Sequence, residues 1–140
     1  MELKVERING KAKLPVFQHD GDAGMDLYSV ESCSLRQGEA RAVSTGIRIA
    51  VPPGYAGLIW DKSGLSLKGL HRLAGVIDSG YRGEVKVVLV NLGRDTFTIE
   101  QGKKIAQLLI QKIETVRVVE VENLDKTSRG ENGFGSTGEY

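Results

Sequence analysis

Apolar and polar residues alternate with a period of two along much of the chain. Apolar residues occupy every second position over 47–51, and the pattern recurs over 85–89. A valine-rich stretch, 116–121, follows near the end of the chain. Because successive side chains of a strand point to opposite faces, each of these stretches predicts a β-strand.

Turn-forming residues separate the strand-like stretches. Pro-Pro-Gly lies at 52–54, Asp-Ser-Gly at 78–80, Asn-Leu-Gly at 91–93 and Glu-Gln-Gly at 100–102. Glycine, proline, asparagine and aspartate favour the backbone angles of tight turns, so the chain is expected to reverse direction there. Strand-length pieces at intervals of roughly ten residues predict an all-β fold, either a sandwich or a barrel.

Two segments have features of a helix. Residues 63–70 predict one short helix, with Ser63 at its N-cap and Gly69 as its stop. Residues 104–112 fit either a helix or a fully buried strand, because their apolar residues also recur at helical spacing. We favour a strand for 104–112, since Gly102 precedes it and strand-like sequence follows.

The last stretch, 122–140, differs from the rest of the chain. Apolar residues are rare there, and four glycines lie within 130–138. Such a segment buries too little apolar surface to order itself, so we divide the chain into a β-sandwich core, 1–121, and a C-terminal arm, 122–140. A frayed terminus is one interpretation of the arm. The other is a lid that orders on a ligand, because Phe134 can stack on a base and glycine N–H groups can bind an anion.

Charge and cysteine content narrow the function classes. The chain has 140 residues, enough for one domain, and 19 Lys and Arg against 18 Asp and Glu give a net charge of +1. This balance argues against a protein that coats nucleic acid or an anionic membrane, so neither is expected as a partner. The first residues lack the apolar region of a signal peptide, and the single Cys33 forms no internal disulfide. We therefore expect a cytoplasmic location, or the interior of the host cell if the chain is viral.

Eighteen glycines are unusually many for 140 residues. Five glycine-containing segments place polar or charged residues beside strand-like sequence. Taken singly, each has an ordinary structural explanation, such as a hairpin turn at Asp78 or a helix start at Ser63. Asp61 before Lys62 breaks the P-loop pattern, although a cation beside a helix start still suits a phosphate. The segments are 23–29, 62–65, 75–84, 102–108 and 129–138.

Taken together and in this order, the five segments resemble the five motifs of the trimeric dUTPases, the deoxyuridine triphosphate nucleotidohydrolases. The sharpest are Ala-Gly-x-Asp-Leu-Tyr-Ser at 23–29, Gly-Val-Ile-Asp-x-x-Tyr-Arg-Gly-Glu at 75–84 and Arg-Gly-x-x-Gly-Phe-Gly-Ser-Thr-Gly at 129–138. The resemblance implies a jelly-roll-type β-sandwich or distorted barrel with one short helix and a flexible glycine-rich arm. It also implies a homotrimer in which each active site draws on all three subunits.

The reaction implied by the resemblance is dUTP plus water giving dUMP and diphosphate, which lowers dUTP and supplies dUMP for thymidylate synthesis. Asp78 would orient and deprotonate the water that attacks the α-phosphorus. Mg²⁺ is the implied cofactor, bound mainly by phosphate oxygens, with Asp26 contacting it through water. Tyr81 would lie under the deoxyribose and exclude a 2′-hydroxyl.

The resemblance also assigns the substrate contacts. The phosphates would be bound by Lys62, Ser63, Gly64, Gln107, Arg129, Ser136 and Thr137. The uracil and deoxyribose would be bound by Gly75, Val76, Ile77, Asp78, Tyr81, Lys86 and Phe134.

The chain departs from the family pattern at three positions. Lys62 and Lys104 stand where the family has arginine, and Asn132 stands where it has glycine. A lysine keeps the positive charge but lacks the planar fork of arginine, so phosphate contacts at these positions are expected to be less fixed in geometry. Asparagine tolerates a left-handed backbone well, so the third departure is expected to be benign.

Two other functions stay open at this point. A dCTP deaminase, or a bifunctional deaminase and diphosphatase, could share the fold, and Glu84 is the only acidic candidate for that reaction in the third motif. A non-catalytic dUTP-binding sensor is the second alternative, because of the two lysines that replace arginine. A purely structural β-sandwich leaves the glycine-rich segment around Phe134 unexplained.

Overall fold

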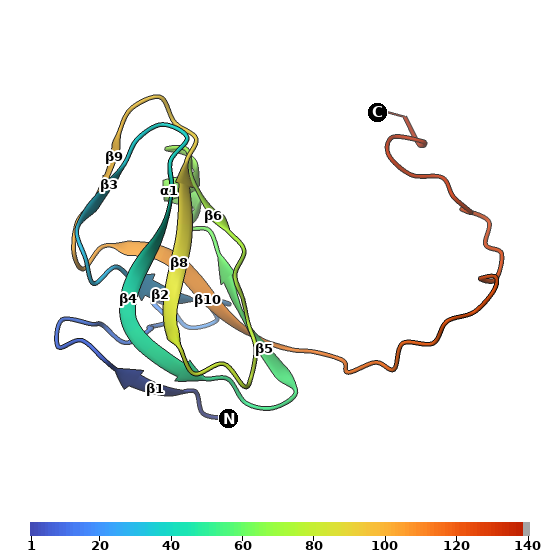
Figure 1. Cartoon of the computed structure of the whole chain (residues 1–140), viewed down its shortest axis with the longest axis horizontal. Helices are drawn as coiled ribbons and strands as arrows, with labels where there is room; N and C mark the ends of the chain where they lie inside the picture. The colour runs from blue at the N-terminus through green and yellow to red at the C-terminus, as the bar shows by residue number, and fades with distance from the viewer. Residues whose placement is uncertain (139–140) are drawn as a thin grey trace.

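The computed structural model describes residues 1–138. These residues form ten β-strands and one short helix, and all the strand pairs are antiparallel (Figure 1). The elements are β1 (Lys4–Arg7), β2 (Met25–Tyr28), β3 (Cys33–Leu35), β4 (Ala40–Ala50), β5 (Tyr55–Trp60), α1 (Ser63–Ser66), β6 (Leu70–Leu73), β7 (Val76–Ile77), β8 (Glu84–Asn91), β9 (Phe97–Ile99) and β10 (Lys104–Lys112).

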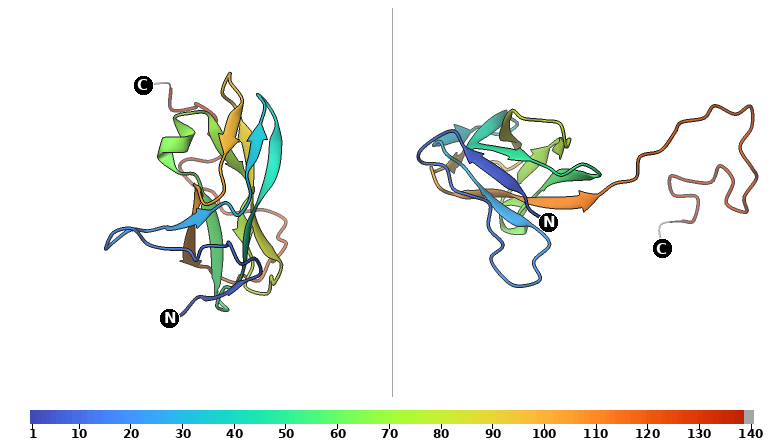
Figure 2. Two further views of the ribbon diagram at one scale, coloured as in Figure 1. Left: turned by 90° about the vertical axis from the view of Figure 1, so that its left-hand side faces the viewer. Right: turned by 90° about the horizontal axis from the view of Figure 1, so that it is seen from below.

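Two four-stranded sheets enclose one apolar core. The first has the strand order β1-β4-β8-β6 and the second β2-β10-β5-β7, while β3 and β9 pair as a separate ribbon. Buried side chains of β4 and β8, such as Ile47 and Val87, form a single cluster with those of β2 and β10, such as Leu27 and Leu108. The core therefore lies between the sheets, and the predicted all-β fold with one short helix is confirmed (Figure 2).

Three of the strand predictions are confirmed. Residues 47–51 fall largely within β4, and residues 85–89 fall within β8. Along β8, buried residues alternate with more exposed ones, as expected for a strand with one face on the core. Residues 104–112 form β10, so strand wins over helix there because β10 pairs with β2 on one side and β5 on the other.

The strand predicted over 116–121 is wrong for the single chain. After Lys112 the chain leaves the sheets and runs away from them without regular structure (Figures 1 and 2). Val116 is 74% exposed and Val118 is 91% exposed. The sequence pattern indicates that these residues suit a strand, but in the described chain they lie beside no strand edge with which they could form hydrogen bonds.

The short helix lies where the sequence predicts it, but its capping differs. The N-cap position is Lys62, not Ser63, and no side chain bonds to the free N–H groups. The helix ends at Ser66, and the predicted stop at Gly69 has a φ of +88°. A Cβ at Gly69 would lie 2.6 Å from the backbone nitrogen of Gly93, so only glycine fits. Among residues 1–138, no helix is long and apolar enough to cross a membrane.

Several connections pass from one sheet to the other, and two of them carry side chains that are predicted to belong to the site. The first leads from β5 through α1 to β6 and includes Lys62 and Ser63. The second leads from β7 to β8 and includes Asp78 and Tyr81. Loops on a rigid sandwich are a common place for binding residues, because the packed strands fix where the loops begin and end.

Candidate active site

A cavity of about 500 Å³ opens beside the β7–β8 connection. It brings together six of the seven residues predicted to bind uracil and deoxyribose; only Phe134 is absent. Its walls combine apolar side chains with a few polar groups, as expected for a small-molecule site. The lining residues are Ile59, Ala74, Gly75, Val76, Ile77, Asp78, Tyr81, Glu84, Val85 and Lys86.

Two glycines shape this cavity. Gly75 has a φ of +127°, and a Cβ there would lie 2.8 Å from the Cβ of Ile59. The Tyr81 hydroxyl donates a 2.9 Å hydrogen bond to the Glu84 carbonyl, which folds the ring back along the β7–β8 connection. A Cβ at Gly83 would overlap the Tyr81 hydroxyl, so glycine is needed for this position of the ring.

The β7–β8 connection is held by its backbone and by one arginine. The Tyr81 N–H donates to the Asp78 carbonyl at 3.1 Å, which closes the turn. The guanidinium of Arg82 donates to the carbonyls of Ser79 (2.7 Å) and Tyr81 (3.0 Å). These bonds leave the Asp78 carboxylate exposed at the cavity.

A second cavity, of about 390 Å³, collects residues predicted to contact phosphates and metal. Asp26, Lys62, Ser63 and Gln107 all line it, whereas Gly64 lies next to Ser63 in α1 without lining it. The cavity shares no lining residue with the first. The lining residues are Gln18, His19, Asp22, Ala23, Gly24, Asp26, Lys62, Ser63, Lys104 and Gln107.

Asp26 is a buried carboxylate, 2% exposed, between two lysines. Lys62 donates a short hydrogen bond to Oδ1, and Lys104 Nζ lies 3.3 Å from Oδ2. Burial raises the pKa of the Asp26 carboxyl, but the hydrogen bond from Lys62 and the positive charge of both lysines outweigh it, so the pKa lies below its usual range. Oδ2 is buried and has no partner with hydrogen-bond geometry among the described residues.

Gln107 lies at the centre of the second sheet. In β10 it pairs with Asp26 of β2 on one side and with Trp60 of β5 on the other. Its Nε2 donates to the Asp61 carbonyl at 2.8 Å. A Cβ at Gly24 would overlap Gln107 Oε1, so Gly24 makes room for this side chain. Neither Gly24 nor Asp61 is predicted as a site residue from the sequence, because both contact Gln107, which is distant from them in the sequence.

Glu84, the carboxylate that a deaminase would need, has a structural partner. Its Oε2 accepts a 2.9 Å hydrogen bond from the N–H of Gly46. Gly46 has a φ of +71° and lies where the β4–β8 register shifts, between Ser44 and Arg48. Glu84 therefore joins β8 to an irregular point of β4, where strand pairing alone leaves the Gly46 N–H free.

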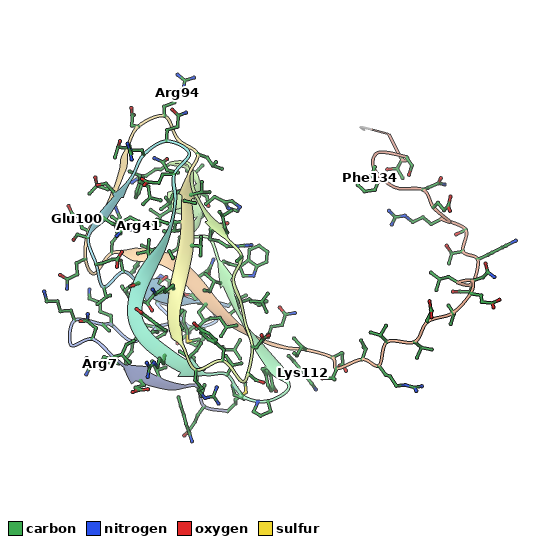
Figure 3. The ribbon with its side chains drawn as sticks, viewed as in Figure 1. Arg7, Arg41, Arg94, Glu100, Lys112 and Phe134 are labelled. Carbon is green, nitrogen blue, oxygen red and sulfur yellow. The ribbon has the colours of Figure 1, made fainter. Side chains whose placement is uncertain are left out.

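The predicted arm residues lie apart from both cavities. Figure 3 shows Phe134 far from the strands and from Lys112, where β10 ends. Arg129 bonds only locally in the described chain, donating to the Asn132 carbonyl at 3.0 Å. The structure thus groups the predicted residues into a nucleoside set and a phosphate set and leaves Arg129, Phe134, Ser136 and Thr137 outside both.

The sequence profile described as dUTPase matches residues 10–138. The chain belongs to the dUTPase family. The match extends over the residues of both cavities and over 122–138.

Similar proteins cover almost the whole chain. A protein named deoxyuridine 5′-triphosphate nucleotidohydrolase from Clostridium kluyveri is 50% identical over 99% of both chains. Its counterpart from Corynebacterium diphtheriae is 49% identical over 97% of this chain and 92% of the relative. Among solved structures, a Staphylococcus bacteriophage 80alpha dUTPase with dUpNHpp matches with a TM-score of 0.93, at 31% identity over 98% of both chains.

A second solved structure bears on metal binding. It is a mutant dUTPase from phage phi11 of S. aureus, in which a structural Mg(II) ion is coordinated. It matches with a TM-score of 0.83 at 29% identity and covers 88% of this chain and 98% of its own. Within residues 1–138 of the present chain, no three His, Cys, Asp or Glu side chains cluster in a way that could hold a metal ion.

Asp26→Asn is expected to lower the free energy of unfolding at pH 7 by about 1–3 kcal/mol, the cost of losing hydrogen bonds to a charged group. Because the Asp26 pKa is lower in the folded chain, the carboxylate stabilises the fold above the unfolded pKa. That stabilisation is lost as the pH falls through the folded pKa. The variant should therefore lose less stability on acidification than wild type, which urea unfolding at a series of pH values measures.

Asp20→Asn, a change at an exposed aspartate, is the control for this measurement. It should follow the wild-type curve. The same acid-side loss of stability in Asp26→Asn and wild type would contradict a lowered pKa at Asp26.

Proposed function

We propose that this chain hydrolyses dUTP to dUMP and diphosphate in a Mg²⁺-dependent reaction. The observation that carries the proposal is the pair of cavities on one sandwich: one lined by Asp78 and Tyr81, the other by Lys62, Ser63 and Gln107. One suits a nucleoside and the other suits phosphates. The names of the relatives support dUTP as the substrate. We place the reaction in the cytoplasm, where nucleotide pools are made.

The nucleoside cavity offers backbone groups to a base. β7, which forms one wall, lies at the edge of the second sheet and pairs only with β5. An edge strand leaves one side of its N–H and C=O groups without strand partners, and these groups can read the polar edge of uracil. The Tyr81 ring in the β7–β8 connection would lie under the deoxyribose, where a 2′-hydroxyl would clash.

The phosphate cavity supplies charge and donors. Lys62 and Lys104 bring two cations, and Ser63 and Gln107 bring polar donors. The first turn of α1 adds free backbone N–H groups, including the one at Gly64. Because Lys62 is a compact charge without a guanidinium fork, phosphate orientation depends more on the surrounding groups than it would with arginine.

Asp78 would carry the chemical step. Its carboxylate is exposed at the nucleoside cavity and can hold a water against the α-phosphorus. As the water oxygen bonds to phosphorus, Asp78 takes its proton, the bond from the α-phosphorus to the bridging oxygen breaks, and diphosphate leaves. Phosphoryl transfer depends mainly on positioning and charge stabilisation, so a weak base in the right place suffices.

The residues present fit a Mg²⁺ ion held mainly by the substrate. Asp26 Oδ2 is a buried acceptor without a hydrogen bond among the described residues, so it can accept one from a metal-bound water. No cluster of three protein ligands exists within 1–138, which agrees with phosphate oxygens and waters as the main ligands. When bound, Mg²⁺ would offset the negative charge of the phosphates.

We further propose a homotrimer whose active sites are shared among subunits. The exposed valines at 116, 118, 119 and 121 favour contact with another copy, because a run of β-branched residues in water is unfavourable. A second copy would also bring the arm, 122–140, over a site that its own chain does not reach. Arg129, Ser136 and Thr137 would then bind the γ-phosphate, with Phe134 on the uracil. Residues 139 and 140 of this predicted arm lie outside the described residues.

Diphosphate release from purified protein with Mg²⁺ tests the reaction. We expect release from dUTP and not from dTTP, dCTP or UTP. Asp78→Asn should keep dUpNHpp binding near wild type and lower kcat by about 10²–10⁴, the usual contribution of a general base.

Other outcomes would contradict the proposal. Near-normal turnover in Asp78→Asn would remove Asp78 as the base. Binding of dUTP without any release by wild type would point to a sensor. Ammonia release from dCTP would point to a deaminase, in which Glu84 would have to leave the Gly46 N–H.

Deleting residues 128–140 tests the role of the arm. We expect most of the dUTPase activity to be lost, by about tenfold or more, because the lid that excludes water is gone. The melting temperature should stay within about 2 °C of wild type, since the exposed arm buries little apolar surface. Calorimetry and diphosphate release measure the two effects, and a large fall in melting temperature would make the arm a structural element instead.

A further inference from the structure

Asp61 joins three elements at the start of the phosphate-binding turn. It lies between β5 and α1, directly before Lys62. Its carbonyl accepts a 2.8 Å hydrogen bond from Gln107 Nε2 of β10. Its carboxylate reaches β6: Oδ1 accepts a 2.7 Å hydrogen bond from the Arg72 N–H, and Oδ2 lies 2.9 Å from His71 Nδ1. One residue therefore contacts both sheets through its main chain and its side chain.

Contacts of Arg72, next to His71 in β6, hold the β6 end of the connection between β5 and β6. The Arg72 guanidinium lies over the Trp60 ring, with Cζ 4.5 Å from the ring centroid. Arg72 Nη1 also donates to the Ala74 carbonyl at 2.8 Å. Trp60, before the turn, therefore packs against Arg72, after it. The Asp61 carboxylate adds polar contacts with His71 and Arg72.

The turn that follows has little to hold it from within. α1 is a single turn, and no side chain bonds to its N-terminal N–H groups. Lys62, at its N-cap, is a flexible side chain with one point charge. Misplacement of a binding group by about 1 Å can cost a large factor in rate, so a site of this kind needs support from outside.

We propose that Asp61 is a positioning residue of the phosphate site, and that His71 holds its carboxylate in place. Asp61 fixes the backbone that presents Lys62 and Ser63, and its carbonyl orients the Gln107 amide. It acts through these residues: its carboxylate is directed to β6 and does not line the cavity that holds Asp26 and Lys62. The inference rests on the proposed binding of the dUTP phosphates at Lys62, Ser63 and Gln107.

Asp61→Ala separates positioning from general damage by comparing two ligands. The Kd of dUpNHpp, which carries the phosphates, should rise by about tenfold, the effect of losing one to two hydrogen bonds. The affinity for deoxyuridine, which has no phosphate, should stay within about twofold, because the cavity at Asp78 and Tyr81 does not include Asp61. Asp95→Ala, at an exposed aspartate in the β8–β9 connection, is the matched control and should change neither.

Equal loss of affinity for both ligands, or no loss for either, would overturn the positioning role. The wild-type protein decides the proposed function separately, by whether it releases diphosphate from dUTP. The role of Asp61 is then tested only by the ratio of the variant's affinity to the wild-type affinity for each ligand. A failure of the positioning role can therefore be distinguished from a failure of the proposed function.

A pair of His71 variants covers the case in which Asp61→Ala does not fold. His71→Asn keeps an amide donor near the position of Nδ1, whereas His71→Leu removes it. His71→Leu should weaken dUpNHpp binding by about three- to tenfold, and His71→Asn should restore it to within about twofold of wild type. Equal binding by the two variants would show that the contact with Asp61 does not support the phosphate site.

Discussion

The phosphate side of the molecule depends on one buried charge. Asp26 is almost without solvent contact, and an isolated carboxylate at such a position would be strongly destabilising. Two cations remove that penalty, and they come from different parts of the chain: Lys62 follows β5, and Lys104 begins β10. Asp26 therefore draws three segments together before any ligand is present. It also holds two lysines side by side at the place where we propose that a triphosphate binds.

Much of the fold could be predicted because it is local. Alternation of apolar residues identified β4 and β8, the flanking sequence favoured a strand at β10, and glycines identified the turns between strands. The stretch 116–121 shows the limit, since alternation reports that a segment suits a strand but not that a partner strand is in reach. The same holds for Ser63, a good N-cap by type, which the backbone instead places one residue inside α1.

The site was predicted where it rests on residue types in a fixed order, and missed where it rests on contacts across the fold. Asp78 and Tyr81 lie close together in the β7–β8 connection and share one predicted motif, although their cavity also needs Gly75 and Gly83 to make room for the turn and the ring. Asp61 is distant in sequence from Gln107, and no local sequence pattern predicts that the Asp61 carbonyl accepts a hydrogen bond from the Gln107 amide. Such contacts follow from the strand register of β10, which only the assembled sheet defines.

The extended arm bears on the timing of product release in the proposed reaction. Phe134 lies on an extended segment, so in the proposed homotrimer it would meet a site at a fixed effective concentration, on the order of millimolar, however dilute the protein is. Fixing each arm residue costs about 1–2 kcal/mol of backbone entropy, which only contacts with a bound ligand can offset. A triphosphate offers the arm more contacts than a monophosphate does. In the proposed reaction, cleavage would therefore remove part of what holds the arm on the site, so the reaction itself would set when the product is released.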